Sequence, residues 1–236
     1  MKPFRKLQYR VLNRLLYSGR FGDIGLRKKL IVHLPKQLSN YIDIGAFDGA
    51  FFSGLRKELD IKNTLLIEPQ QKYGALLEEK FKGESNVTVR KTILSDTEEE
   101  VLFHIQNLNA TSSMLRMDES AIGNEIDTGA ESGVKMKAEI LDRVAEKING
   151  QIDLLKIDVQ GAELIVLKGG AKTLERTSHI WIEVSFLPLY EGSAVFNDVF
   201  DFMTQHGFRL VSILEGFRRK DGELLQADCL FSKKEK

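Results

Sequence analysis

The 236 residues of this chain fit one medium-sized domain, with or without an appended segment. A hydrophobic content of 42% beside 29% charged residues is typical of globular proteins, which excludes disordered and collagen-like classes. The single cysteine, Cys229, cannot form an internal disulfide, so a cysteine-rich zinc module is excluded and a cytoplasmic location is favoured.

The first 40 residues are strongly basic although the whole chain has no net charge. They contain ten Lys or Arg and one acid, Asp23, which gives +9 and leaves −9 for the remainder. Leu7, Val11 and Leu15 recur at four-residue spacing, which predicts an amphipathic helix. We therefore expect a basic helical arm at 1–39 in front of a body at 40–236. The arm either packs against the acidic body or contacts an anionic surface.

From residue 40 onward, short apolar runs typical of strands alternate with runs of helical periodicity. Strands are predicted at 41–44, 64–67, 87–93, 101–105, 134–140, 152–157, 180–184, 209–213 and 224–231. Helices are predicted at 50–59, 72–81, 141–148, 164–174 and 194–206. Strands separated by helices of this length predict an α/β fold with a mostly parallel sheet covered on both faces.

A glycine-containing turn follows the first predicted strand. Asp43 ends the strand, and the chain passes through Gly45, Phe47, Asp48 and Gly49 before a helix begins. A dinucleotide site requires a glycine where this chain has Phe47, because the pyrophosphate lies against the backbone there. The strand-end acid suits a cationic ligand. The turn therefore favours S-adenosylmethionine, which carries positive charge and no phosphate.

Acidic residues also follow the next two predicted strands. Glu68 comes 19 residues after Gly49, the spacing at which a carboxylate accepts both ribose hydroxyls of an adenosine group. Ser95 and Asp96 follow the third strand, where Asp96 either accepts from the adenine amino group or forms a helix cap or turn. These residues complete the predicted cofactor site, whose members are Asp43, Gly45, Phe47, Asp48, Gly49, Glu68, Ser95 and Asp96.

The densest group of charges follows the predicted strand at 152–157. Asp158 ends that strand, Lys156 lies on the same strand face, and Glu163 falls in the first turn of the next helix. Two carboxylates at one sheet edge can orient a hydroxyl, accept its proton or hold a divalent metal. The alternative is a helix-capping acid together with a salt bridge to Lys156.

With these motifs in order, the chain resembles the FkbM family of S-adenosylmethionine-dependent methyltransferases from about residue 40 to 231. The matching segments are 43–49, 67–69, 95–96, 112–115, 141–142, 155–163, 167–169 and 181–184, of which Leu155-Lys-Ile-Asp-Val-Gln-Gly-Ala-Glu163 is the most specific. Family patterns often have Glu where this chain has Gln160, so Gln160 is not assigned a catalytic role.

The resemblance implies a Rossmann-like class I methyltransferase domain with a doubly wound sheet of seven strands, the last antiparallel. It also implies methyl transfer to a hydroxyl of a sugar, glycan or natural product. A weakly acidic hydroxyl needs a base or a metal, so Asp158 is the first candidate base. Glu163 and Glu183 are supports, and Asp158 with Glu163 would be the ligands of any divalent metal such as magnesium. His104 and His33 are outside candidates, and the segment 107–118 could close over the donor or substrate.

Two other functions remain open from the residues alone. The first is a nucleotide-dependent oxidoreductase, against which Phe47 counts. The second is a non-catalytic binding module whose arm contacts a partner such as nucleic acid, because Phe4, Tyr9 and Tyr17 interleave its charges as stacking sites would. The same spacing fits the core-facing side of a helix, so the non-catalytic binding module is the least favoured hypothesis. A small-molecule or glycan substrate is the expected partner, and the arm could also form an oligomer contact.

Overall fold

The computed structural model describes residues 31–106, 109–122 and 132–234. The helix predicted in the arm therefore lies outside the described residues. The first described strand, β1 (Gln37–Ile44), begins within the range assigned to the arm, because Leu38 is already buried in the core. No helix of the described residues is both long and apolar enough to cross a membrane.

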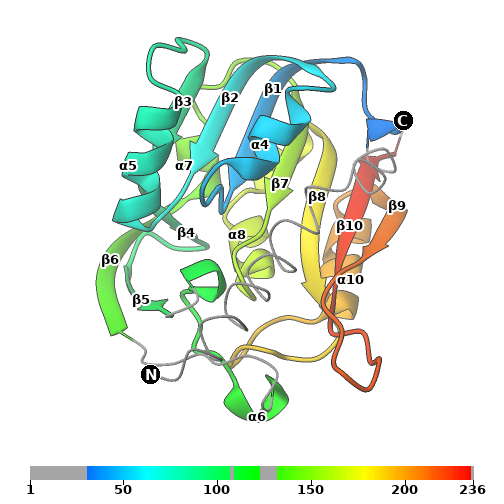
Figure 1. The fold of residues 1–236 in the computed structure, drawn as a ribbon. Helices are drawn as coiled ribbons and strands as arrows, with labels where there is room; N and C mark the ends of the chain where they lie inside the picture. The colour runs from blue at the N-terminus through cyan, green and yellow to red at the C-terminus, as the bar shows by residue number, and fades with distance from the viewer. Residues whose placement is uncertain (1–30, 107–108, 123–131, 235–236) are drawn as a thin grey trace.

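A seven-stranded sheet forms the centre of the domain, with strand order β3-β2-β1-β7-β8-β10-β9 (Figure 1). Its remaining strands are β2 (Asp60–Ile67), β3 (Val87–Arg90), β7 (Ile152–Ile157), β8 (Thr177–Ser185), β9 (Phe208–Glu215) and β10 (Gln226–Lys233). Only β10 runs antiparallel to its neighbours, β8 and β9. The predicted mostly parallel seven-stranded sheet with an antiparallel last strand is confirmed.

Helices cover both faces of this sheet and divide the core into two layers. The helices are α4 (Ala50–Leu55), α5 (Gln71–Lys80), α6 (Glu119–Ile122), α7 (Leu141–Val144), α8 (Glu163–Lys168), α9 (Ala171–Glu175) and α10 (Phe196–Gln205), with the short 3-10 helix η2 (Asn109–Thr111). One layer packs Phe52 of α4 and Leu77 of α5 against Tyr41 of β1. The other packs Leu167 of α8 and Met203 of α10 against the opposite face. The alternation of strand and helix runs predicted this covering.

A second sheet of three strands, β4-β6-β5, was not predicted as a separate unit. It contains β4 (Ile93–Ser95), β5 (Glu100–Ile105) and β6 (Ser132–Ile140). The prediction of one strand at 87–93 was wrong, because the chain leaves the main sheet after β3 and pairs β4 with β6 instead. This departure brings β4 and β5 beside the end of the main sheet (Figure 1).

The helix predicted at 164–174 is also divided, into α8 and α9, at Gly169 and Gly170. A Cβ at Gly169 would come within 2.3 Å of the Ser95 carbonyl oxygen, so the chain passes there without room for a side chain. The main sheet is parallel across β2, β1, β7 and β8, so these strands end at the same edge. Ile44, Ile67 and Ile157 close three of them, and the site lies directly beyond.

Candidate active site

A cavity opens at the carboxyl ends of β1, β2 and β7, where ligands bind in doubly wound sheets. Five of the predicted site residues line it, namely Gly45, Phe47, Asp48, Glu68 and Asp158. The start of β4 and the residue before it contribute Thr92, Ile93 and Leu94 to the cavity wall. The segment 109–118 contributes Ala110, Ser112 and Met114. This segment therefore borders the cavity, and its closure over a donor or substrate stays a prediction.

The turn after β1 passes very close to the end of β7. Gly45 has a φ of 76°, and a Cβ there would lie 1.9 Å from the Asp158 carbonyl oxygen. Phe47 also has a positive φ, 49°, and its ring centroid lies 3.9 Å from that of Tyr73. A non-glycine residue in this conformation costs roughly 1–2 kcal/mol. The backbone can approach both the ligand and β7 only because residue 45 has no side chain.

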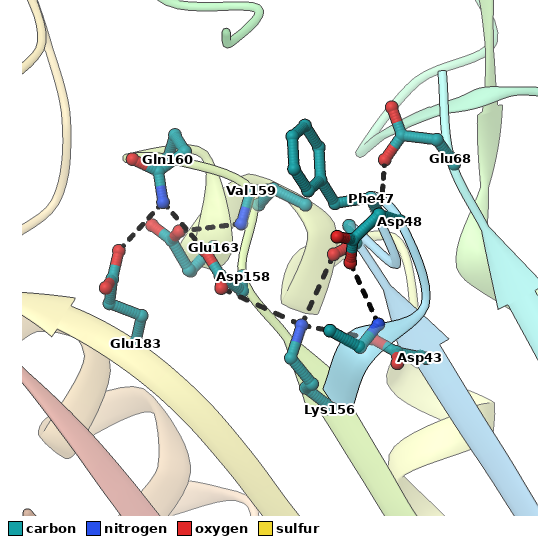
Figure 2. Close-up of polar contacts among 12 residues, drawn as sticks. Asp43, Phe47, Asp48, Glu68, Lys156, Asp158, Val159, Gln160, Glu163 and Glu183 are labelled. Carbon is teal, nitrogen blue, oxygen red and sulfur yellow. Dashed lines mark hydrogen bonds and ion pairs between the residues drawn. The ribbon is translucent and has the colours of Figure 1, made fainter. Parts of the chain in front are cut away.

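Glu68, directly after β2, is 3% exposed and lines the cavity. Its two carboxylate oxygens accept hydrogen bonds from the Phe47 and Gln70 backbone N–H groups, each at 2.9 Å. Figure 2 shows the contact with Phe47. Burial raises the pKa of Glu68 to about 7, against the lowering effect of these N–H groups and of Lys156. The turn and the acid predicted to bind adenosine are thus in direct contact.

Asp43 does not line the cavity but forms an ion pair beneath the turn. It is fully buried, and its Oδ1 lies 3.0 Å from Nζ of Lys156, its register partner on β7. Lys156 Nζ also donates to the Gly45 carbonyl oxygen at 3.3 Å. Burial lowers the pKa of Lys156, but the carboxylates of Asp43 and Asp158 outweigh it, so the pKa is raised overall. The negative charge of Asp43 is therefore paired with Lys156, a residue of this chain, and not with a cationic ligand.

Asp158 is the member of the predicted acidic group that reaches the cavity. Its side chain is 24% exposed, with Oδ2 at 3.7 Å from Lys156 Nζ. Its Oδ1 accepts a hydrogen bond from Gln160 Nε2 at 2.7 Å, and the same nitrogen donates to Glu183 Oε2 at 3.0 Å. The dashed contacts in Figure 2 therefore run from Glu183 through Gln160 to Asp158 and Lys156.

Glu163, at the start of α8, organises the turn that carries Asp158. Its Oε1 accepts from the backbone N–H groups of Val159 and Gly161, each at 3.1 Å. Burial raises the pKa of Glu163 to about 7, helped by the charge of Asp158 and opposed by backbone hydrogen bonds. Glu163 and Glu183 are both buried and lie outside the cavity lining, and their role as supports of Asp158 stays a prediction.

Several predicted residues are not brought to the cavity wall. Ser95 and Asp96 contact each other, with Ser95 Oγ donating to Asp96 Oδ1 at 3.2 Å, and the wall near the third strand is formed by 92–94 instead. Gly49 begins α4 with φ 71°, packed against Leu77 of α5. The outside candidates His33 and His104 do not line the cavity. The role of each toward a cofactor stays a prediction.

The acids do not form a recognisable metal centre. Among residues 31–106, 109–122 and 132–234, no three His, Cys, Asp or Glu side chains gather in a way that could hold a metal ion. Asp158 and Glu163, the expected ligands of magnesium, accept hydrogen bonds from Gln160 and from the turn backbone. We therefore assign no step to a metal.

Comparisons with known proteins agree with this architecture. A family model described as the methyltransferase FkbM domain matches residues 43–210. The 2-O-methyltransferase NoeI of Sinorhizobium fredii (strain NBRC 101917 / NGR234) is 25% identical over 201 residues, which are 81% of each chain.

Two solved structures are also similar. The TrmK protein of M. capricolum, in complex with its cofactor product S-adenosyl-homocysteine, matches 88% of this chain and 67% of its own, with 11% identity and a TM-score of 0.51. The FkbM methyltransferase of Methylobacillus flagellatus KT has 14% identity and a TM-score of 0.49 over 84% of this chain. The chain spans 44% of that second protein.

Proposed function

Because this chain belongs to the FkbM methyltransferase family, we propose that it transfers a methyl group from S-adenosylmethionine to a hydroxyl of a sugar, glycan or natural product. The observation that carries the cofactor assignment is the contact between Glu68 and the turn after β1. A buried carboxylate and a turn open to close backbone approach meet at one wall of the cavity. This is the arrangement that an adenosine group requires.

The charges of the cavity favour S-adenosylmethionine over a dinucleotide. The lining residues include three acids, Asp48, Glu68 and Asp158, and one base, Lys156. That base already contacts Asp43 and Asp158, so the wall offers little compensation to a pyrophosphate. A sulfonium and an ammonium group gain from the same acids. Phe47, which stands where a dinucleotide needs glycine, supports the same choice.

The residues of the cavity would then bind the cofactor, exclude water and accept a proton. Glu68 would accept the ribose hydroxyls, and Ile93, Leu94 and Met114 would exclude water. S-adenosylmethionine, when bound, supplies an activated methyl group, which passes to the acceptor oxygen while the electrons of the broken carbon–sulfur bond stay on sulfur. Asp158 would accept the proton of the attacking hydroxyl, since its side chain is partly exposed at the cavity.

The choice of a hydroxyl acceptor is supported by the relative named as a 2-O-methyltransferase and by the presence of a carboxylate base at the cavity. Transfer to oxygen needs such a group because a hydroxyl proton must leave as the bond forms. The acceptor class is tested with labelled S-adenosylmethionine and a panel of neutral mono- and oligosaccharides, counting label in the methylated product.

The base is tested by Asp158→Asn, which keeps the shape of the side chain. We expect kcat to fall by about 100- to 10,000-fold while binding of S-adenosylmethionine stays within a few-fold. The exposed Glu79 of α5 provides a matched control, because Glu79→Gln removes one carboxylate that does not line the cavity. Full activity in Asp158→Asn would remove Asp158 from the mechanism, whereas absence of labelled product with every acceptor would contradict the proposed activity.

A further inference from the structure

The turn between β7 and α8 holds one side chain in an unusual conformation. Gln160 has a φ of 57°, in the region that non-glycine residues rarely adopt. Gly161 follows with φ 95°, so close to Tyr190 that a Cβ would lie 2.8 Å from its Cδ2. Such strain persists only where the surroundings enforce it, and it concentrates at functional sites. The Gln160 side chain is therefore held in a defined place.

All three contacts of the Gln160 amide fit one orientation. Its Nε2 donates to Asp158 Oδ1 and to Glu183 Oε2, at 2.7 and 3.0 Å. Its Oε1 accepts from the Tyr190 hydroxyl at 3.1 Å. Ionised carboxylates only accept hydrogen bonds, so rotating the amide by half a turn would set its oxygen against both of them. The single proton of the Tyr190 hydroxyl is shared between Gln160 Oε1 and the Thr111 carbonyl oxygen. The amide is thus bound at both ends.

The two carboxylates that Gln160 joins have different positions. Glu183 lies within β8 and is 2% exposed, so it is a fixed internal anchor, and its Oε2 also accepts from Gln226 Nε2 at 2.8 Å. Asp158 lines the cavity, and its Oδ2 is the oxygen that Gln160 does not bind. The Tyr190 oxygen also lies 3.1 Å from the Thr111 carbonyl, in the segment that borders the cavity. Gln160 therefore connects a rigid anchor to Asp158, an acid of the cavity wall.

We propose that Gln160 is a positioning residue that orients Asp158 to receive the proton of the acceptor hydroxyl (Figure 2), with Tyr190 fixing the far end of the amide. This inference rests on the proposed function of Asp158. A carboxylate free to rotate presents its oxygens to the substrate in many directions, and misplacement by about 1 Å can cost on the order of 100-fold in rate. Gln160 removes that freedom by binding one oxygen.

The charges around Asp158 explain why an amide suits this position. Ionisable groups surround it on several elements: Lys156 on β7, which also pairs with Asp43 on β1, Glu163 on α8, Glu183 on β8 and Tyr190 after β8. Acids outnumber the single cation. An amide donates to two of these acids and adds no charge, whereas a carboxylate at residue 160 would repel both. The arrangement depends on glutamine at this position.

The test compares two amides that bind the same oxygen of Glu183. Gln160→Met removes the donor to both Asp158 and Glu183, whereas Gln226→Met removes a donor to Glu183 alone. We expect Gln160→Met to lower kcat at least about tenfold, with the KM for S-adenosylmethionine within twofold of wild type. Gln226→Met should keep kcat within about twofold. Melting temperatures establish that both variants fold.

The pH profile provides a second readout that a purely structural role would not move. In Gln160→Glu, the added carboxylate should shift the acid limb of kcat upward by about one pH unit or more, because it favours protonation of its neighbours. The titration of Asp158 can also be followed through the carbon-13 resonance of its carboxyl carbon, in the absence of any acceptor. In Gln160→Glu the midpoint of this titration should move to higher pH as well. Gln226→Met should leave both titrations in place.

Failure of this inference is distinguishable from failure of the proposed function. If wild type is active and Asp158→Asn is not, but Gln160→Met keeps wild-type kcat and titration, Gln160 does not position Asp158. Equal losses in Gln160→Met and Gln226→Met would assign both amides to folding and overturn the inference. If wild type transfers no methyl group, the proposed function fails, and the carbon-13 titration still decides whether Gln160 acts on Asp158.

Discussion

The contact between the turn after β1 and the end of β7 predicts a large effect of one added methyl group. Gly45→Ala places a Cβ 1.9 Å from the Asp158 carbonyl oxygen at a φ of 76°. The left-handed conformation costs roughly 1–2 kcal/mol for alanine, and overpacking adds about 1–3 kcal/mol. The free energy of unfolding should fall by about 2–5 kcal/mol, which lowers the Tm by about 4–20 °C in a domain of this size.

Gly83→Ala separates the two contributions. Gly83 has a φ of 85°, and no atom lies within 4 Å of its Cβ position, so alanine there costs only the conformational part, roughly 1–2 kcal/mol. The assay is thermal unfolding of both variants, followed by titration with S-adenosylmethionine. We expect Gly45→Ala to melt lower and to lose at least about tenfold in affinity, because the displaced turn carries Phe47 and its contact to Glu68. Equal melting temperatures and affinities in the two variants would show that a Cβ at residue 45 does not displace the turn.

The remaining predictions concern the buried charges. Lys156→Met leaves fully buried Asp43 without its cation, so urea unfolding should show a loss of about 3–5 kcal/mol, which adding Asp43→Asn should largely restore. Burial raises the pKa of Glu68 to about 7, so affinity for S-adenosylmethionine should increase from about pH 6 to pH 8, while Glu68→Gln should bind weakly at every pH. Burial also raises the pKa of Glu163 to about 7 in the folded state. The folded protein therefore binds the extra proton, and stability should fall as pH rises from about 4.5 to 7, by up to about 3 kcal/mol. Glu163→Gln should lack that share of the pH dependence, because its amide oxygen still accepts the N–H groups of the turn.

The strand ends were predictable because an apolar run followed by an acid is a local signal. Glu68 and Asp158 directly follow buried strands, Asp43 is the second-last residue of β1, and parallel pairing brings these positions to one edge. The break between α8 and α9 also has a local signal in Gly169-Gly170, two adjacent glycines inside a helical pattern.

Other parts of the site depend on contacts between segments far apart in the chain. The residues 92–94 line the cavity because β4 pairs with β6, more than 40 residues later, and the apolar run 87–93 gives no sign of this. The Asp43–Lys156 pair requires the register between β1 and β7. Tyr190 follows β8 as an isolated aromatic residue, and only the packed structure shows its hydroxyl at Gln160. Periodicity in a single sequence does not carry such pairings.

Whether the cavity binds S-adenosylmethionine is decided by calorimetric titration of the purified protein with S-adenosylmethionine and S-adenosylhomocysteine, with NAD as the comparison ligand. We expect binding to wild type on the order of micromolar, and binding about 100-fold weaker to Glu68→Ala, because the ribose hydroxyls lose their buried acceptor. NAD should not compete. Absence of binding to wild type shown to be free of carried-over ligand, or tighter binding of NAD, would contradict the cofactor site described here.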